Sequence, residues 1–128
     1  MRALPFYDDE LSSGFMKMEG ILRVESGKLT FEFQKKDGIL EAIKSSIQTA
    51  EIDLADIDLI EYKKKLFGAR LILHAKRAVV FQDIPGEDLT TRTLKIKKKH
   101  REIAANLASN VNLILSERKL KELSEDNE

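Results

Sequence analysis

Residues 16–33 read MKMEGILRVESGKLTFEF, and this stretch decides the fold. Apolar side chains occupy alternate positions before a short polar link and again after it, where Leu29, Phe31 and Phe33 follow one another at intervals of two. This alternation predicts two half-buried strands, because successive side chains of a strand point to opposite faces. The link contains Ser26-Gly27, which suits a tight hairpin turn because glycine adopts positive φ without steric cost. We therefore expect a β-hairpin.

The same alternating pattern recurs along the chain as far as residue 96. Five further strands are predicted, at residues 47–54, 57–62, 71–73, 79–81 and 94–96. The parity of the apolar positions changes between Leu59 and Ile60, which indicates a β-bulge. Turns are expected at residues 66–68 and 84–86, whereas residues 34–46 form either a short helical turn around Ile39, Leu40 and Ile43 or an extended excursion.

The last part of the chain changes to a helical period. Ile103, Leu107, Val111, Ile114 and Arg118 recur at spacings of three and four, which predicts an amphipathic helix from about residue 98 to about residue 123. Its apolar stripe is broad enough to cover a sheet. We expect one domain over residues 15–123, preceded by an N-terminal extension (residues 1–14) and followed by a disordered acidic tail (residues 124–128).

Length and composition restrict the class of protein. A chain of 128 residues is of the usual size for a single domain, and its 22 Lys and Arg balance its 22 Asp and Glu. The charge is unevenly distributed, since residues 63–101 hold twelve basic and three acidic side chains, a net charge of +9. There is no cysteine, which excludes disulfides, thiolate nucleophiles and cysteine-bound metals. No window is apolar enough for a signal peptide or a membrane span, so a cytoplasmic protein is expected.

Seven short strands and one terminal helix define a mainly β fold of the α+β type. An antiparallel sheet of this size must bury one face, and a bent sandwich or partly open barrel capped by the C-terminal helix meets that need. The segments Gly20–Val24, Gly27–Phe33, Ile52–Ile57, Gly68–Leu73 and Arg101–Asn112 resemble the bacterial pleckstrin-homology-like (PH/GRAM-like) domain family. The resemblance covers roughly residues 15–118. It implies a barrel of this kind with a binding function.

Two departures limit what the resemblance implies. Eukaryotic members place a tryptophan in the C-terminal helix, whereas this chain has none and would use Ile103, Leu107 or Val111 there. Lipid-binding members hold inositol phosphates with a long basic first loop, which here is only Ser26-Gly27. Phosphoinositide binding is therefore not expected.

Two basic clusters are the candidate anion- or partner-binding site. The first comprises Lys63, Lys64, Lys65 and Arg70 around Leu66-Phe67-Gly68; the second lies in the run from Lys95 to Arg101 and includes Lys97, Lys98 and Arg101. Clustered cations attract phosphates or carboxylates, although the alternation of Lys95 and Lys97 with apolar residues favours a solvated strand face over a binding site. Phe67 is either a core residue or an exposed anchor, and the shortness of the turn favours the core.

No motif points to catalysis or to a metal. His74 and His100 have no third ligand at a metal-binding spacing, and Asp53, Asp56 and Asp58 alternate with apolar residues as on a solvent-facing strand. Nucleophile and phosphate-loop motifs are absent as well. We expect no enzyme activity, no cofactor and no metal.

These observations favour a non-catalytic binding or adaptor module that acts through protein contacts, including self-association into a homo-oligomer. Exposed strand edges and the turn at Leu66-Phe67-Gly68 are the expected contact elements. The alternative is attachment to anionic membrane lipids through the basic residues, each of which would contribute on the order of 1 kcal/mol near such a surface. Nucleic acid is disfavoured because only Phe67 is expected to be available for stacking on bases.

Overall fold

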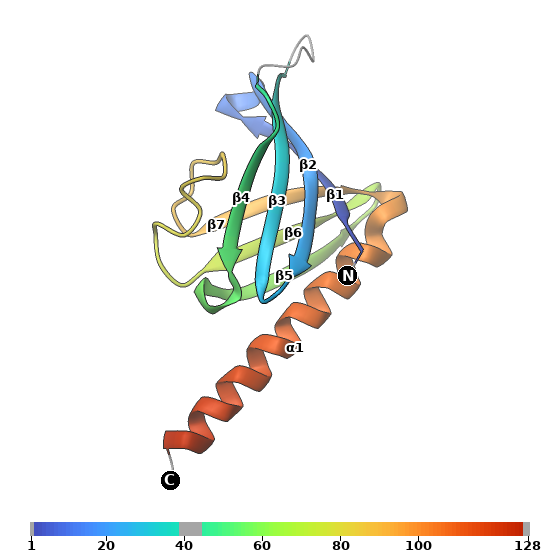
Figure 1. The fold of residues 1–128 in the computed structure, drawn as a ribbon. Helices are drawn as coiled ribbons and strands as arrows, with labels where there is room; N and C mark the ends of the chain where they lie inside the picture. Colours follow the sequence, from blue (N-terminus) through green and yellow to red (C-terminus); the bar gives the residue numbers. More distant parts are fainter. Residues whose placement is uncertain (1, 39–44, 127–128) are drawn as a thin grey trace.

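The computed structural model describes residues 2–38 and 45–126 (Figure 1). Its strands within these ranges are β1 (Leu4–Leu11), β2 (Met16–Glu25), β3 (Lys28–Asp37), β4 (Gln48–Asp53), β5 (Ile57–Lys65), β6 (Gly68–Ala75) and β7 (Thr91–Lys97). The short 3-10 helices η1 (Ser12–Gly14), η2 (Leu54–Asp56) and η3 (Lys98–His100) precede β2, β5 and the helix α1 (Arg101–Asp126), respectively. Ile39, Leu40 and Ile43, the residues of the expected excursion, lie outside the described residues.

The described strands form one antiparallel sheet in the order β4-β3-β2-β1-β7-β6-β5. Figure 1 shows that the sheet bends strongly, so that β2, β3 and β4 cross in front of β5, β6 and β7. Its two end strands, β4 and β5, are joined by η2 but do not pair, and the barrel therefore stays open. The expected mainly β fold, with seven antiparallel strands and one C-terminal helix, is confirmed.

The inner face of the bent sheet carries the core. On β3 the side chains of Leu29, Phe31 and Phe33 are buried at alternate positions, and the ring of Phe31 meets that of Phe6 edge to face at a centroid distance of 6.0 Å. Buried apolar side chains from the other strands and from α1 complete a single cluster. The period of two predicts which face is inside, because a one-residue slip would turn every one of these side chains towards solvent.

The β2–β3 hairpin matches the sequence prediction. Ser26 and Gly27 have φ values of 49° and 75°, and positive φ at both central residues is the mark of a type I′ turn. A bulge is also present in β5, although it lies before Leu59 and not between Leu59 and Ile60 as expected. Ile57 faces Ala75 and Leu59 faces His74, so Asp58 is the extra residue on β5.

Two expectations about the strands are wrong. One strand was not predicted and one predicted strand does not form, so the expected number of strands is still the observed one. The expected N-terminal extension contains β1, which is the central strand of the sheet and pairs with both β2 and β7. The first loop of the sheet is therefore residues 12–15, and the expectation that Ser26-Gly27 is the first loop is wrong. The strand expected at residues 79–81 is instead part of a turn-rich connection between β6 and β7. Leu4 and Phe6 of β1 are buried. The sequence did not predict this strand because the acidic residues 8–10 interrupt the alternation of apolar side chains.

The connection between β6 and β7 is held by a buried arginine. Arg92 is only 8% exposed, and its guanidinium donates hydrogen bonds to the carbonyl oxygens of Ile84 and Phe81, both at 3.0 Å, and to those of Thr91 and Asp88. It also lies over the Phe81 ring, 5.4 Å from the centroid. Phe81 is therefore buried by the folding of this connection and not by an alternating strand.

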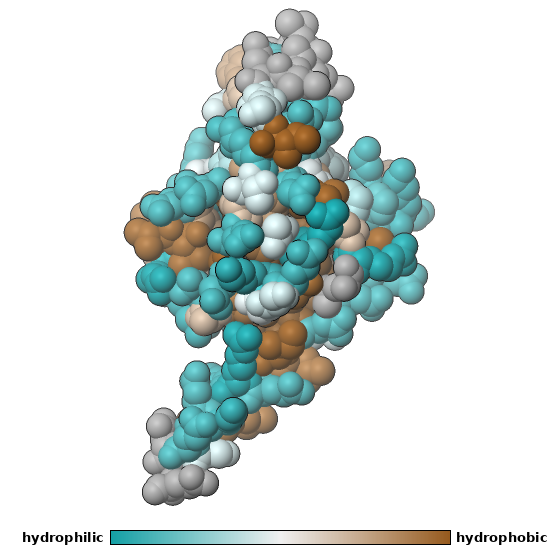
Figure 2. Space-filling view, viewed as in Figure 1, coloured by the Kyte–Doolittle hydropathy of each residue, from teal (hydrophilic) through white to brown (hydrophobic). Residues whose placement is uncertain are grey.

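The helix α1 packs mainly on β5 and closes the edge of that strand. Ala104, Leu107, Ala108 and Val111 are its buried residues. Beyond the sheet the helix continues to Asp126, into the segment expected to be a disordered tail, and its second half projects away from the body (Figure 1). Figure 2 shows hydrophobic surface over the middle of the helix, just beyond the sheet. Within the described ranges, no helix combines the length and the apolar character that a membrane crossing requires.

The edge of β5 is sealed by one side chain of this helix. Asn112 accepts a hydrogen bond at Oδ1 from the Ile60 N–H at 3.0 Å and donates from Nδ2 to the Ile60 carbonyl oxygen at 2.7 Å. The amide thus replaces the partner strand that an edge residue lacks, and it obstructs the pairing of another chain at this point.

Candidate binding surface

The ladder β5-β6-β7 brings cations of both basic clusters onto one outer face, whereas Lys64 is in register with the buried Ala69 and Ile96 and so belongs to the opposite face. Lys63 pairs with Arg70, which pairs with Lys95 on the next strand, so these three cations form one row across the sheet. The neighbouring row begins at Lys65, passes through Gly68 and ends at Lys97. Residues in register across neighbouring strands share a face, and these rows therefore form a continuous basic face.

The β5–β6 turn projects two apolar side chains from the end of this face. Leu66 is 78% exposed and Phe67 is 86% exposed. The expectation that Phe67 is a core residue is wrong. The two-residue turn joins Lys65 directly to its partner Gly68, so neither turn side chain can fold back onto the inner face.

Lysines surround this turn from both sides. Lys63, Lys64 and Lys65 lead into it. Lys97 ends β7 beside Gly68, and Lys98 and Lys99 follow that strand. A Cβ on Gly68 would lie 2.4 Å from the carbonyl oxygen of Ile96, so only glycine allows β7 to approach the turn this closely. We call Leu66, Phe67 and these six lysines the basic tip. Lys99 and Leu66 were not among the predicted site residues, although both adjoin residues that were.

Arg101 has a positioning role at the basic tip. Its Nε donates to the carbonyl oxygen of Gly68 at 2.7 Å, and its Nη2 donates to the carbonyl oxygens of both Lys65 and Leu66. The first residue of α1 thus holds the turn in place with its side chain. The charge remains at the surface, but its hydrogen-bonding groups are largely used within the chain.

The basic residues between Lys95 and Arg101 differ in whether a carboxylate pairs with them. Lys95 contacts Asp9 at 2.6 Å and Glu10 at 3.3 Å, both on β1. This pairing raises the pKa of Lys95, and the hydrogen bond from Lys95 holds the pKa of Asp9 below its usual range. Within the described part of the chain, no carboxylate lies within ion-pair distance of Lys97, Lys98 or Lys99.

The lysines of β5 are almost as free. Lys63 lies 4.0 Å from Glu61, at the limit of an ion pair, and no described carboxylate pairs with Lys64 or Lys65. Glu61 itself contacts His74 at 2.5 Å across the β5–β6 ladder. The basic tip therefore retains an uncompensated positive charge. Its apolar residues Leu66 and Phe67 project from the turn between these lysines.

The two histidines lie in separate elements, with His74 on β6 and His100 in η3. Among the residues that the structure describes, no group of three or more potential metal ligands gathers.

Comparisons of the chain with protein-family models, with curated proteins and with solved structures find no match.

Proposed function

We propose that this protein is a non-catalytic binding module of the pleckstrin-homology-like class that attaches to anionic membrane surfaces through its basic tip. The observation that carries the proposal is the pair of exposed apolar side chains, Leu66 and Phe67, at the end of a hairpin surrounded by six lysines. Scattered exposed apolar residues are ordinary. Two adjacent ones beside lysines of which only Lys63 approaches a described carboxylate match the two layers of a membrane interface, charged headgroups above acyl chains.

The expected affinity is sufficient for reversible attachment. If four of the six lysines reach the headgroups at about 1 kcal/mol each, and the two apolar side chains add about 2 kcal/mol by partial burial, the total is about 6 kcal/mol. This corresponds to a partition ratio on the order of 10⁴. The class is supported by the partly open barrel, whose end strands β4 and β5 do not pair, and by the C-terminal helix. Both features are implied by the resemblance of residues 15–118 to the pleckstrin-homology-like family.

Sedimentation with vesicles of phosphatidylcholine, alone or mixed with phosphatidylserine, tests the proposal. Binding is expected only with the anionic lipid, and it should be lost between about 0.1 M and about 1 M salt as the screening length contracts from about 10 Å to about 3 Å. Phe67→Ser should weaken binding without lowering stability because the ring makes no buried contact. The matched control is Phe15→Ser, which removes an exposed phenylalanine from the β1–β2 connection.

Two triple variants distinguish the effect of where the positive charges lie from the effect of the total charge of the protein. Lys63→Gln, Lys64→Gln and Lys65→Gln together should abolish sedimentation, whereas Arg118→Gln, Lys119→Gln and Lys121→Gln remove the same charge from the projecting helix and should leave it nearly intact. Equal losses in both triple variants, or no binding at low salt, would contradict attachment through the basic tip.

A second candidate, protein contact, is favoured by β4. This strand ends the sheet order and its outer edge pairs with no strand among the described residues, so it can accept an extended peptide. The opposite edge strand, β5, is less available because Asn112 occupies the backbone groups of Ile60. Partner-induced NMR shifts confined to residues 48–53, together with no vesicle binding, would favour this second candidate.

A further inference from the structure

A small pocket opens beside the basic tip, on the outer face of the sheet. It measures about 210 Å³ and lies where β1 and β7 part, because these strands share a single registered pair, Tyr7 with Lys95. We call it the seam pocket. Its lining comprises the β1 residues Pro5, Phe6 and Tyr7, the β2 residues Glu19 and Gly20, and Lys97, Lys99 and His100 from the end of β7 and from η3.

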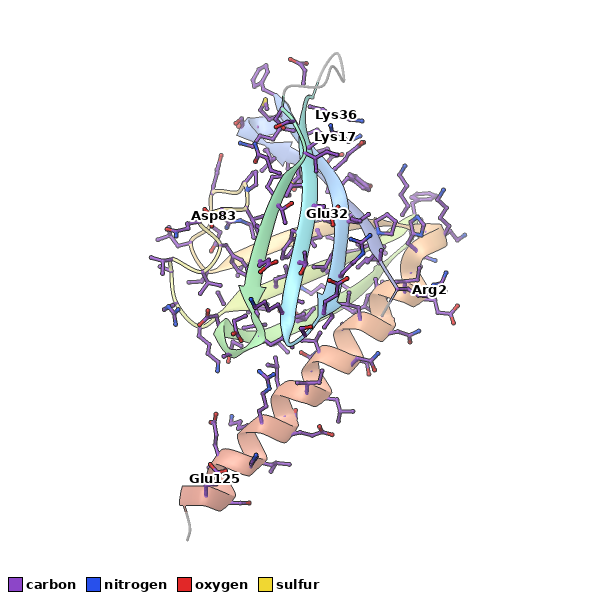
Figure 3. All side chains as sticks on the ribbon, in the orientation of Figure 1. Arg2, Lys17, Glu32, Lys36, Asp83 and Glu125 are labelled. Atoms are coloured by element: carbon purple, nitrogen blue, oxygen red, sulfur yellow. The ribbon has the colours of Figure 1, made fainter. Side chains whose placement is uncertain are left out.

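Three basic groups of the seam pocket converge from one segment. Lys97 and Lys99 are exposed, have no described carboxylate partner and both precede His100 by at most three residues. Arg2, labelled in Figure 3, lies near the start of α1 and adds to the positive field at His100. This field is one reason why the pKa of His100 lies below its usual value, after burial, which is the largest cause.

The one carboxylate of the pocket is already neutralised by partners. Glu19 contacts Lys17 at 3.0 Å through Oε1 and Lys36 at 2.6 Å through Oε2. Lys17 and Lys36 are register partners on β2 and β3, side by side in Figure 3. Their hydrogen bonds hold the pKa of Glu19 below its usual range. An anion in the pocket therefore meets a carboxylate whose charge two lysines compensate, and two further lysines that lack such a partner.

We infer that the seam pocket binds a phosphomonoester group, presented by a soluble molecule or by a lipid headgroup. Two ammonium groups and an imidazole suit a tetrahedral dianion with several acceptor oxygens, because an ammonium is a compact point charge with no preferred plane. A carboxylate is better matched by the planar fork of an arginine, and among the described residues that line the seam pocket there is no arginine.

The lipid form of this inference rests on the proposed function and deepens it. Lys97 belongs both to the basic tip and to the lining of the seam pocket, and it pairs in register with Gly68 at the end of the turn. A surface that receives Leu66 and Phe67 is therefore next to the pocket. A headgroup that carries a terminal phosphate can enter it while its acyl chains remain beside the turn.

Inorganic phosphate is the first probe. Added at constant ionic strength, it should give saturable NMR shifts at the amides of Phe6, Tyr7 and Gly20 and should raise the pKa of His100, since a bound anion favours the imidazolium. Lys97→Gln with Lys99→Gln should weaken this binding by about tenfold or more. Lys119→Gln with Lys121→Gln, the matched loss of charge on the projecting helix, should not. Shifts that do not saturate, or equal weakening in both double variants, would overturn the inference.

Vesicles distinguish the two sources of the phosphate group. Phosphatidic acid ends in a phosphomonoester, whereas phosphatidylserine does not, and the two can be compared at equal surface charge. A preference for phosphatidic acid that Lys97→Gln with Lys99→Gln removes identifies a lipid headgroup, and saturable phosphate binding without that preference identifies a soluble ligand. Salt-sensitive attachment to both lipids without any phosphate binding would reject the seam pocket and leave the proposed function intact. Phosphate binding without vesicle attachment would do the reverse.

Discussion

Replacing Asn112 should weaken the fold in a way that depends on which half of its amide is lost. In Asn112→Ala the Ile60 N–H and carbonyl groups both lose their partners. Two net hydrogen bonds are worth about 2 kcal/mol, and the better helix propensity of alanine returns about 0.5 kcal/mol. Because the site is half-buried, water replaces part of the loss, and we expect the free energy of unfolding to fall by about 1 to 1.5 kcal/mol.

The near-isosteric change Asn112→Asp gives a sharper test through pH. An ionised carboxylate can still accept from the Ile60 N–H, but it places a second acceptor at the 2.7 Å contact with the Ile60 carbonyl oxygen. The protonated carboxyl can donate there, as the amide does. The folded state therefore raises the pKa of the introduced group above its unfolded value of about 3.9. Its favourable contribution is present below that unfolded value and is lost as the pH rises through the folded one.

Urea denaturation at about pH 4 and about pH 7 measures both effects relative to the unsubstituted protein. The control is Asn110→Asp, an exposed asparagine on the same helix. The deficit of Asn112→Asp should be larger at the higher pH, and that of Asn110→Asp should not grow in the same way. The reasoning is refuted if Asn112→Ala is as stable as Asn110→Ala, or if the deficit of Asn112→Asp is the same at both pH values.

Two further predictions concern Arg92 and His100. Arg92→Met should lower the free energy of unfolding by about 3 kcal/mol, because several carbonyl groups of the β6–β7 connection lose a charged donor. The control is Arg77→Met, at an exposed arginine of the same connection, which should lower it by less than about 1 kcal/mol. Urea denaturation measures both. A small effect at Arg92 would mean that the connection is held otherwise. The pKa of His100, followed by NMR, should lie below the unfolded value of about 6.5 and rise towards it when Lys97 and Lys99 are replaced by glutamine. Its contribution to stability is present above the unfolded pKa and is lost as the pH falls through the folded pKa, and a folded value at or above 6.5 would contradict this.

Local patterns in the sequence predicted the elements whose stabilising contacts are also local. The β2–β3 hairpin follows from alternation and from Ser26-Gly27, and α1 follows from its helical period. Neither β1 nor the β6–β7 connection could be assigned in this way. β1 has few inward apolar residues and gains its place from both neighbouring strands, and Phe81 is buried by an arginine that comes eleven residues later in the chain.

The same distinction between local and long-range contacts applies to the candidate site. Sequence runs identified the lysines of β5 and β7, and the sheet order brings them together. The exposure of Phe67 depends on the register of Lys65 with Gly68, and the role of Arg101 depends on where α1 starts relative to the turn. Residue type indicates charge, but only the packing of distant segments determines which charges remain free.

The weak junction between β1 and β7 has a consequence for how the chain is made. The half-sheet of β1 to β4 consists of hairpins between neighbouring segments, so it can form while the rest of the chain is still on the ribosome. The free edge of β1 must then wait for β7, the last strand to be synthesised. During this interval a long strand edge is open to pairing with a neighbouring nascent chain. Slow translation between β4 and β7 should therefore increase misassembly, and this is the stage at which a chaperone would be of most use to the protein.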